Sequence, residues 1–226
     1  MVKLDRTEQR IVGVLIEKQR TVPDTYPLSE NALVDGCNQK NNRDPITELA
    51  SFQVAGAMMA LQEKRVVRKV DGGGRVARFR HKLDEALPAG ADEIAVLAEL
   101  LLRGPQAPGA LKPRVARLGY HAAPEQIEAL LRQMAARKPA LVEQLPLGPR
   151  ERDRRWRHLI GDGSEQLAGD APSSALAAAA DPTGTTAAAA AGVDLAALVE
   201  RVRVLEQQVA KLRADYGKLT EPGMGD

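Results

Sequence analysis

Few residues of this chain could bind a metal ion, and they are far apart in the sequence. One cysteine, Cys37, and three histidines, His81, His121 and His158, are the only thiol and imidazole groups in 226 residues. Zinc sites use such ligands at short, fixed spacings, and none of the four has a neighbour of that kind. A single cysteine also excludes an intramolecular disulfide. The sequence therefore predicts no metal site and no cofactor.

Nucleophilic catalysis lacks its usual motifs as well. The chain contains no Gly-x-Ser-x-Gly sequence and no phosphate-binding loop. The DGGG run at residues 71–74 precedes a predicted strand, whereas a phosphate-binding glycine loop precedes a helix. Cys37 falls on the inward side of a short predicted helix, where a lone cysteine packs as a small hydrophobe. We expect a protein that is not an enzyme.

An asparagine-rich stretch is the most unusual part of the sequence. Residues 38–45 read NQKNNRDP. Asparagine tolerates left-handed backbone and bonds neighbouring amides, so this stretch predicts a turn between two helices. Gln39, Lys40 and Arg43 within it carry donors that suit bases or phosphates. The stretch is therefore also a candidate contact surface.

Basic residues concentrate in two segments that predict β-hairpins. Residues 64–82 contain eight Lys and Arg against the single acid Asp71, and residues 150–158 contain five Arg against two acids. Strand alternation places Arg78 and Arg80 on one face, which could lie along phosphates or could simply be solvated. The predicted nucleic-acid contacts are Gln39, Lys40, Arg43, Gln53, Arg68, Arg75, Arg78, Arg80, Arg154, Arg155 and Arg157.

The elements that must position these residues follow a recognisable order. We expect helices to begin at the capping residues Thr7, Ser29 and Ser51. A strand, the glycine turn and a second strand follow the third helix. Three helices and a hairpin in this order predict a winged helix-turn-helix domain over residues 1–86.

The same order recurs over residues 87–161, although the two halves share little sequence identity. The third helix of each half shows an apolar face at helical spacing. These faces comprise Val54, Met58 and Leu61 in the first half and Ile127, Leu131 and Met134 in the second. The chain is therefore predicted to be mainly α with small β-hairpins, built from two tandem winged helix-turn-helix domains.

The outer face of the third helix in the first domain does not suit base reading. It presents Phe52, Gly56, Met59 and Glu63, whereas base readers are usually Arg, Lys, Asn or Gln. Exposed Phe52 and Met59 would suit a protein partner, which predicts a protein-interaction scaffold as the alternative function. They could also pack against the second domain.

The chain ends in two segments of different character. Residues 162–192 are rich in Ala, Gly, Ser, Thr and Pro and predict a flexible linker. Residues 193–220 carry apolar residues at alternating spacings of three and four, with Val at a and Leu at d, which favours a parallel coiled-coil dimer. The predicted dimerisation residues are Leu198, Val202, Leu205, Val209 and Leu212.

Charge divides unevenly between these parts. Residues 1–158 contain 27 Lys and Arg against 20 Asp and Glu, and residues 159–226 contain 5 against 10. The basic excess therefore lies in the predicted winged domains, which favours an anionic partner. Without a signal peptide or a long uncharged apolar run, we expect a cytoplasmic protein with no membrane partner.

The run LIEKQRTVPDTYPLSENALVDGCNQKNNRDP resembles the signature of the YceH-like family of bacterial proteins. ALQEKRVVR, RVARFRH and LAELLLRGPQAPGAL extend the resemblance over residues 4–161. The resemblance implies two consecutive winged-helix domains and no established activity. Our leading hypothesis is a non-enzymatic, dimeric DNA-binding or regulatory protein that uses basic wings on the phosphates of double-stranded DNA.

Overall fold

The computed structural model describes residues 2–70, 76–149 and 151–163, so the predicted linker and heptad segment lie outside the described residues. The described elements are α1 (Arg6–Thr21), the 3-10 turn η1 (Pro23–Thr25), β1 (Leu28–Ser29), α2 (Glu30–Cys37), α3 (Ser51–Glu63), β2 (Val67–Val70), β3 (Arg78–His81), α4 (Leu83–Ala86), α5 (Ala91–Arg103), α6 (Pro108–Arg117), α7 (Pro124–Ala136), β4 (Val142–Gln144) and β5 (Trp156–His158). They are mainly helices with two small antiparallel sheets, as predicted.

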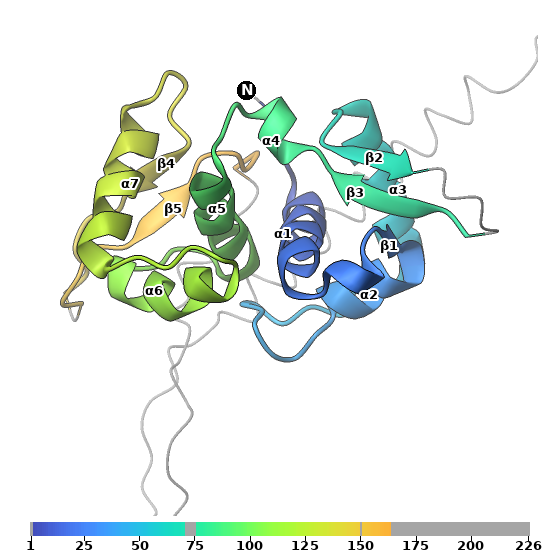
Figure 1. The fold of residues 1–226 in the computed structure, drawn as a ribbon, viewed down its shortest axis with the longest axis horizontal. Helices are drawn as coiled ribbons and strands as arrows, with labels where there is room; N and C mark the ends of the chain where they lie inside the picture. Colours follow the sequence, from blue (N-terminus) through green and yellow to red (C-terminus); the bar gives the residue numbers. More distant parts are fainter. Residues whose placement is uncertain (1, 71–75, 150, 164–226) are drawn as a thin grey trace, which may run out of the picture. The chain divides into compact units, whose positions relative to one another are not determined.

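The order of three helices and a hairpin occurs twice (Figure 1). In the first half, α1, α2 and α3 precede the hairpin of β2 and β3, and the short strand β1 also pairs with β3. In the second half, α5, α6 and α7 precede the hairpin of β4 and β5. Gln106 pairs with Trp156 of β5 at the place that β1 occupies against β3. The strand β1 and the short helix α4 were not predicted from the sequence.

The last strands of the two hairpins share a sequence pattern that the structure explains. Residues 78–81 read RFRH and residues 155–158 read RWRH. In both, the aromatic and the histidine are buried. The two histidines also occupy the same register, because His81 lies opposite Val67 and His158 lies opposite Val142. The repeated pattern therefore marks equivalent inward-facing positions.

An ion pair repeats in the same way between the first and third helices of each half. Lys64, which follows α3, lies 2.6 Å from the carboxylate of Glu8 in the first turn of α1. Arg137, which follows α7, lies 3.2 Å from the carboxylate of Glu93 in the first turn of α5. The two halves thus share a side-chain interaction as well as an order of elements.

Two of the three predicted helix caps are wrong. The cap of α1 is Asp5, whose Oδ1 accepts a hydrogen bond from Glu8 N at 2.8 Å while Glu8 Oε2 accepts one from Asp5 N at 2.8 Å. This reciprocal capping box satisfies two N–H groups that Thr7, inside the helix, could not reach. The cap of α3 is Ala50 rather than Ser51. Ser29 caps α2 as predicted.

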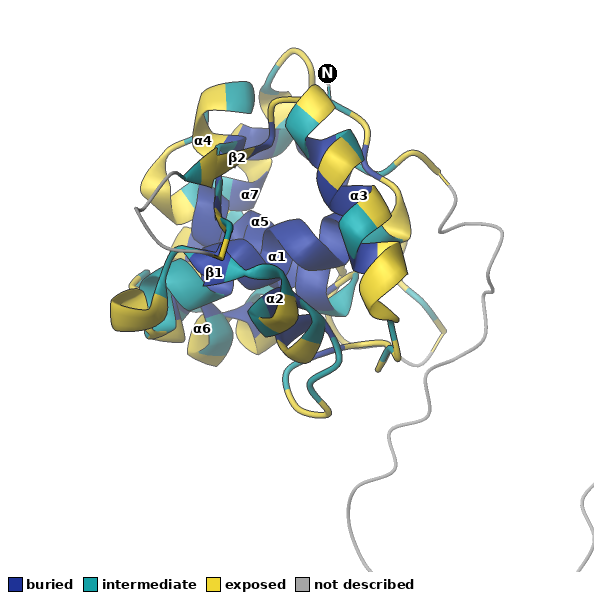
Figure 2. Ribbon diagram, turned by 90° about the vertical axis from the view of Figure 1, so that its right-hand side faces the viewer, coloured by how far each residue is buried: buried dark blue, intermediate teal, exposed yellow. Residues whose placement is uncertain are grey.

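The core runs through the middle of both halves, where α1 and α5 lie side by side (Figure 1). Gly13 of α1 permits this approach, because a Cβ there would lie 2.8 Å from Leu102 Cγ. Figure 2 shows α1 and α5 as buried, with exposed residues on the outer side of α3. The inward faces predicted for α3 and α7 are confirmed, since Val54, Met58, Leu61, Ile127, Leu131 and Met134 are all buried.

The two ends of this repeated structure also meet. Leu4 N donates to Ile160 O at 2.9 Å, and Asp162 N donates to Leu4 O at 3.0 Å. Lys3 Nζ adds a hydrogen bond to Leu159 O at 2.8 Å. The segment before α1 is thereby paired with the segment after β5, so each half contacts the other through its ends as well as through α1 and α5.

Candidate nucleic-acid interface

In the asparagine-rich segment between α2 and α3, the predicted nucleic-acid contact Arg43 is buried. The Arg43 side chain has no exposed surface, and its Nη2 lies 2.6 Å from Glu17 Oε2. Its Nε donates to Gly36 O at 2.9 Å, and its Nη2 also donates to Gln39 Oε1 at 3.1 Å. Arg43 is therefore surrounded by protein and cannot reach a nucleic acid. Arg43 is therefore not part of the candidate interface.

The rest of the segment joins the two halves. Asn42 adopts the left-handed backbone that the sequence favoured, with φ of 61°, and its Oδ1 accepts a hydrogen bond from Arg103 of α5. Asp44 N donates to Leu102 O at 3.0 Å. Arg10 of α1 donates to both Pro45 O and Leu102 O. Lys40 is the predicted contact in this segment whose side chain lies in the open.

Two buried carboxylates complete the junction, and sequence reasoning missed both. Glu17 of α1 and Glu99 of α5 lie 3.1 Å and 3.3 Å from the same Arg117 nitrogen. Arg103 Nε lies 3.4 Å from Glu99. Burial raises the pKa of Glu99, an effect that the neighbouring arginines oppose. The signal was present in the sequence for Glu99, which interrupts the apolar run of residues 94–102, whereas Glu17 stands at the end of an apolar run and gives no such signal.

The outer face of the first hairpin gathers arginines without matching acids. Arg68 and Arg80 lie directly opposite each other in the β2–β3 register, and Arg78 shares their face. Across residues 2–70, 76–149 and 151–163, no carboxylate lies within ion-pair distance of any of the three. Like charges directly opposite each other destabilise a sheet, so this face would gain from a bound anion.

Two further features belong to this face. Arg78 donates to Pro27 O at 2.8 Å, which fixes its guanidinium beside the entry to α2. Arg80 Nε is buried and has no hydrogen-bond partner within the described residues. Arg75, also predicted as a contact, lies outside the described residues. The fold therefore positions Arg78, and no described carboxylate neutralises Arg68, Arg78 or Arg80.

The second hairpin differs, because two of its arginines, Arg155 and Arg157, are paired with carboxylates of the protein. Arg155 Nη2 lies 2.7 Å from Glu151 Oε1, and Arg157 pairs with Glu143, its cross-strand neighbour. Arg154 donates to Gln144 Oε1 at 3.3 Å. Equivalent basic sequences have thus become two electrostatically different surfaces. The first hairpin is the stronger candidate for phosphate contact.

The exposed side of α3 is mixed, and it includes Phe52, Gly56, Met59 and Glu63 as the sequence predicted. Phe52 is 77% exposed and Met59 is 66% exposed. The expectation that they pack against the second half is wrong, because both side chains lie open. Gln53, a predicted nucleic-acid contact, uses its Oε1 to accept a hydrogen bond from Ala50 N at 2.9 Å. This side chain therefore serves the start of α3.

The thiol and two of the three imidazoles are buried, whereas His121 is exposed. Burial raises the pKa of the Cys37 thiol to about 12. Burial lowers the pKa of His81 to about 4, and His81 Nε2 lies 2.5 Å from Gln19 Oε1. Over the described ranges, no three His, Cys, Asp or Glu side chains gather as metal ligands. Each helix in those ranges is too short or too polar to span a bilayer.

The described elements define a mainly helical protein with a repeated order of helices and small hairpins. Residues 4–151 match the family model described as "Protein of unknown function, DUF480". A UPF0502 protein of Dechloromonas aromatica (strain RCB) is 43% identical over 214 residues, which cover 94% of this chain and 93% of that protein. The chain belongs to this family, so the prediction from its YceH-like signature is confirmed.

Two further relatives cover different shares of the chain. A UPF0502 protein of Shewanella loihica (strain ATCC BAA-1088 / PV-4) is 38% identical over 223 residues, which cover 96% of this chain and 98% of that protein. A UPF0502 protein of Geotalea daltonii (strain DSM 22248 / JCM 15807 / FRC-32) is 44% identical over 173 residues, which cover 76% of this chain and 78% of that protein. The similarity to the first of these includes the segment that follows the described residues.

Proposed function

We propose that this chain is a non-enzymatic, cytoplasmic DNA-binding protein built from two tandem winged helix-turn-helix domains. The repeated order of helices and hairpin supports the domain assignment. So does the extra strand pairing in each half, where β1 and Gln106 lie beside the last strand of their hairpins. In this arrangement the β2–β3 hairpin is a wing, whose natural contact is the phosphate backbone of a duplex.

One observation carries the proposal, namely the contrast between the two hairpins. Arg68, Arg78 and Arg80 share a face that no described carboxylate neutralises, whereas Arg155 and Arg157 are ion-paired within the protein. Phosphate contacts release counterions, so the first hairpin should supply most of the salt-dependent affinity. The outer face of α3 offers few base readers, so the binding should discriminate weakly between sequences.

The experiment uses two matched double variants of the full chain. Arg78→Ala with Arg80→Ala removes two arginines from the RFRH pattern, and Arg155→Ala with Arg157→Ala removes the two equivalents from RWRH. Fluorescence anisotropy measures binding to a labelled duplex between 50 and 200 mM salt, a range chosen because phosphate contacts weaken steeply across it. We expect the first variant to lose about two units of the salt slope and the second to lose much less.

The outcomes separate the explanations. Absence of binding by the wild type at the lowest salt would reject the proposal. Equal losses in the two variants would show that net charge, and not the geometry of the first hairpin, governs affinity. Circular dichroism of both variants checks that each still folds.

The proposal includes a homodimer formed by residues 193–220. The heptad spacing supports it, with Val202 and Val209 at a and Leu198, Leu205 and Leu212 at d. A dimer would raise DNA affinity through the effective concentration of the second copy. Sedimentation of the full chain should give twice the monomer mass, and a version ending at residue 161 should be monomeric. Equal monomeric masses at micromolar concentration would reject the dimer.

A second candidate function rests on the exposed apolar residues of α3. Phe52 and Met59 together suit a protein partner, so the chain would act as an interaction scaffold. Affinity capture from the native cell can compare the wild type with Phe52→Glu. Leu147→Glu is a matched control, because Leu147 is a 51% exposed apolar residue of the second half. An unchanged partner set with Phe52→Glu would reject the scaffold.

A further inference from the structure

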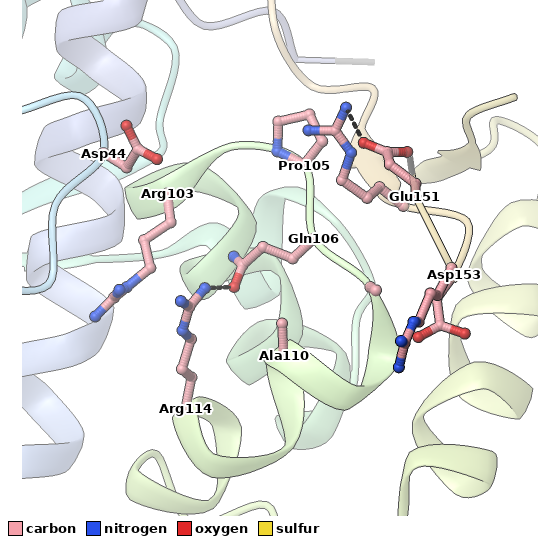
Figure 3. Close-up of a pocket in the computed structure, with 11 residues that line it drawn as sticks. Asp44, Arg103, Pro105, Gln106, Ala110, Arg114, Glu151 and Asp153 are labelled. Carbon is pink, nitrogen blue, oxygen red and sulfur yellow. Dashed lines mark hydrogen bonds and ion pairs between the residues drawn. The ribbon is translucent and has the colours of Figure 1, made fainter. Parts of the chain in front are cut away.

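A cavity of about 410 Å³ lies where the end of α5, the start of α6 and the loop of the second hairpin meet (Figure 3). Small-molecule sites in proteins typically have volumes of about 300–1,000 Å³. Four arginines line the cavity, at positions 103, 114, 152 and 155, together with the three carboxylates Asp44, Glu151 and Asp153. The cavity is distinct from the outer face of the first hairpin, which belongs to the other half.

Gln106 lines this cavity and is held in place by hydrogen bonds. The residue is only 5% exposed. Its backbone exchanges hydrogen bonds with Trp156 at 3.0 Å and 2.8 Å, and its Nε2 donates to Glu99 O at 3.0 Å. The side-chain oxygen is left to accept a hydrogen bond from Arg114, a contact that Figure 3 shows as a dashed line. A buried, fully bonded amide thus fixes the position of the Arg114 guanidinium.

The charge of Arg114 is not cancelled by this contact, because an amide oxygen is neutral. Within the described part of the chain, no carboxylate lies within ion-pair distance of Arg114. Arg103 donates to another neutral amide, Asn42, and shares its carboxylate partner Glu99 with Arg117. Burial and the nearby Arg114 both lower the pKa of Arg103. An anion between these cations would relieve their mutual repulsion.

The start of α6 adds to the attraction for an anion. This helix is ten residues long, and no side chain caps its first turn, because Ala107 occupies the capping position. Ala107 and Ala110 both line the cavity. Pro108 has no N–H, and Ala110 N already donates to Ala107 O at 3.0 Å, so the dipole of the helix rather than free N–H groups favours negative charge here. The helix start and the arginines therefore act in the same direction.

The carboxylates that line the cavity can bind the part of a ligand that carries hydrogen-bond donors. Glu151 already accepts from Arg155 and from Gly148 N. Asp44 and Asp153 are exposed, and neither forms an ion pair within the described residues. Carboxylates of this kind accept hydrogen bonds from hydroxyl or amino groups. A ligand that fills the cavity should carry an anionic group and several such donors.

We propose that this cavity binds a phosphorylated small molecule that also carries hydroxyl or amino groups, which is the chemistry of a nucleotide or a sugar phosphate. The phosphate would contact Arg114 beside the start of α6, and the donors would contact Asp44 and Asp153. Such a site gives the protein an effector that the DNA contact of the first hairpin does not require.

The test replaces Ala110, an exposed residue in the first turn of α6, with Asp and with Asn. Asp at position 110 lies one turn before Arg114, so its carboxylate can pair with that arginine and occupy the anion position. An acid in the first turn also favours the helix, so the variant should fold. Asn has nearly the same size and no charge, which makes it the matched control.

Isothermal titration at low salt uses four probes, namely inorganic phosphate, adenosine monophosphate, glucose 6-phosphate and adenosine. We expect at least one phosphate ester to bind more tightly than inorganic phosphate, and adenosine not to bind. Ala110→Asp should weaken the ester at least about tenfold, a change of 1.4 kcal/mol or more. Ala110→Asn should bind it like the wild type. The better ester identifies the class of ligand.

Three results would overturn the proposal. These are no ester binding at millimolar concentration, an affinity unchanged by Ala110→Asp, or inorganic phosphate binding as tightly as both esters. The double variant Arg78→Ala with Arg80→Ala should retain ester binding even if it no longer binds DNA. The two proposals can therefore fail independently.

Discussion

Glu17 Oε2 and Arg43 Nη2 lie 2.6 Å apart in the interior between the two halves, with 3% and 0% of their side chains exposed. The pair joins α1 to the asparagine-rich segment that follows α2. That segment continues to α5 through Asn42 and Asp44. The most distinctive stretch of the sequence thus connects the two halves through a buried ion pair and a chain of hydrogen bonds.

Arg43→Ala should lower the free energy of unfolding by about 3–5 kcal/mol, because it leaves the buried Glu17 with one fewer cation. Urea denaturation of the full chain measures the change. Lys40→Ala is the matched control, since Lys40 is an exposed cation of the same segment, and its effect should stay within about 0.5 kcal/mol. Equal midpoints for the two variants would contradict a structural role for the pair.

Gly13→Ala should destabilise the junction of α1 and α5. The added Cβ would lie 2.8 Å from Leu102 Cγ, and overpacking of this kind costs about 1–3 kcal/mol. Gly56→Ala in α3 is the control, because no atom lies within 4 Å of its added Cβ, and the better helix propensity of Ala should stabilise α3 by up to about 1 kcal/mol.

A double-mutant cycle can attribute the Gly13 effect to its contact. Leu102→Ala removes the side chain that the new Cβ would meet, so Gly13→Ala should cost less in that background than alone. Thermal or urea unfolding of the four proteins gives the coupling free energy. Additive changes would show that Gly13 is required for another reason.

The His81 imidazole should make stability depend on pH. Burial lowers its pKa to about 4, against an ordinary value of 6.5, while the nearby Asp84 opposes the shift. Between these values the unfolded chain binds more protons than the folded chain, so stability is lost as the pH falls from about 6.5 to about 4. The contribution of His81 is on the order of 3 kcal/mol, since one pKa unit corresponds to about 1.4 kcal/mol.

Urea unfolding at several pH values measures this contribution. His81→Gln cannot protonate, so its stability should decline less than that of the wild type between pH 6.5 and 4. Other titrating groups are common to both proteins and cancel in the comparison. His121→Gln, at an exposed position, should follow the wild type. Parallel profiles for His81→Gln and the wild type would contradict the prediction.

Local pattern was sufficient for most of the fold. Apolar spacing gave the inward faces of α3 and α7, and alternation around turns gave both hairpins. The errors fell where two residues compete for one local role. Asp5 and Thr7 are both good caps, and only the reciprocal bond with Glu8 decides between them. The short strand β1 was missed because two residues are too few to show the alternation of buried and exposed side chains that marks a strand.

The sequence by itself determined the repeated order of three helices and a hairpin, the family, the basic character of both hairpins and the outward position of Phe52 and Met59. Only the tertiary structure decided which basic residues remain available to a partner. Arg43 pairs with a carboxylate 26 positions earlier in the chain, and Arg157 pairs with one across its hairpin. Arg68 and Arg80, in contrast, lie opposite each other in the strand register. Charge is carried by single residues, but its neutralisation and burial depend on neighbours that folding brings together.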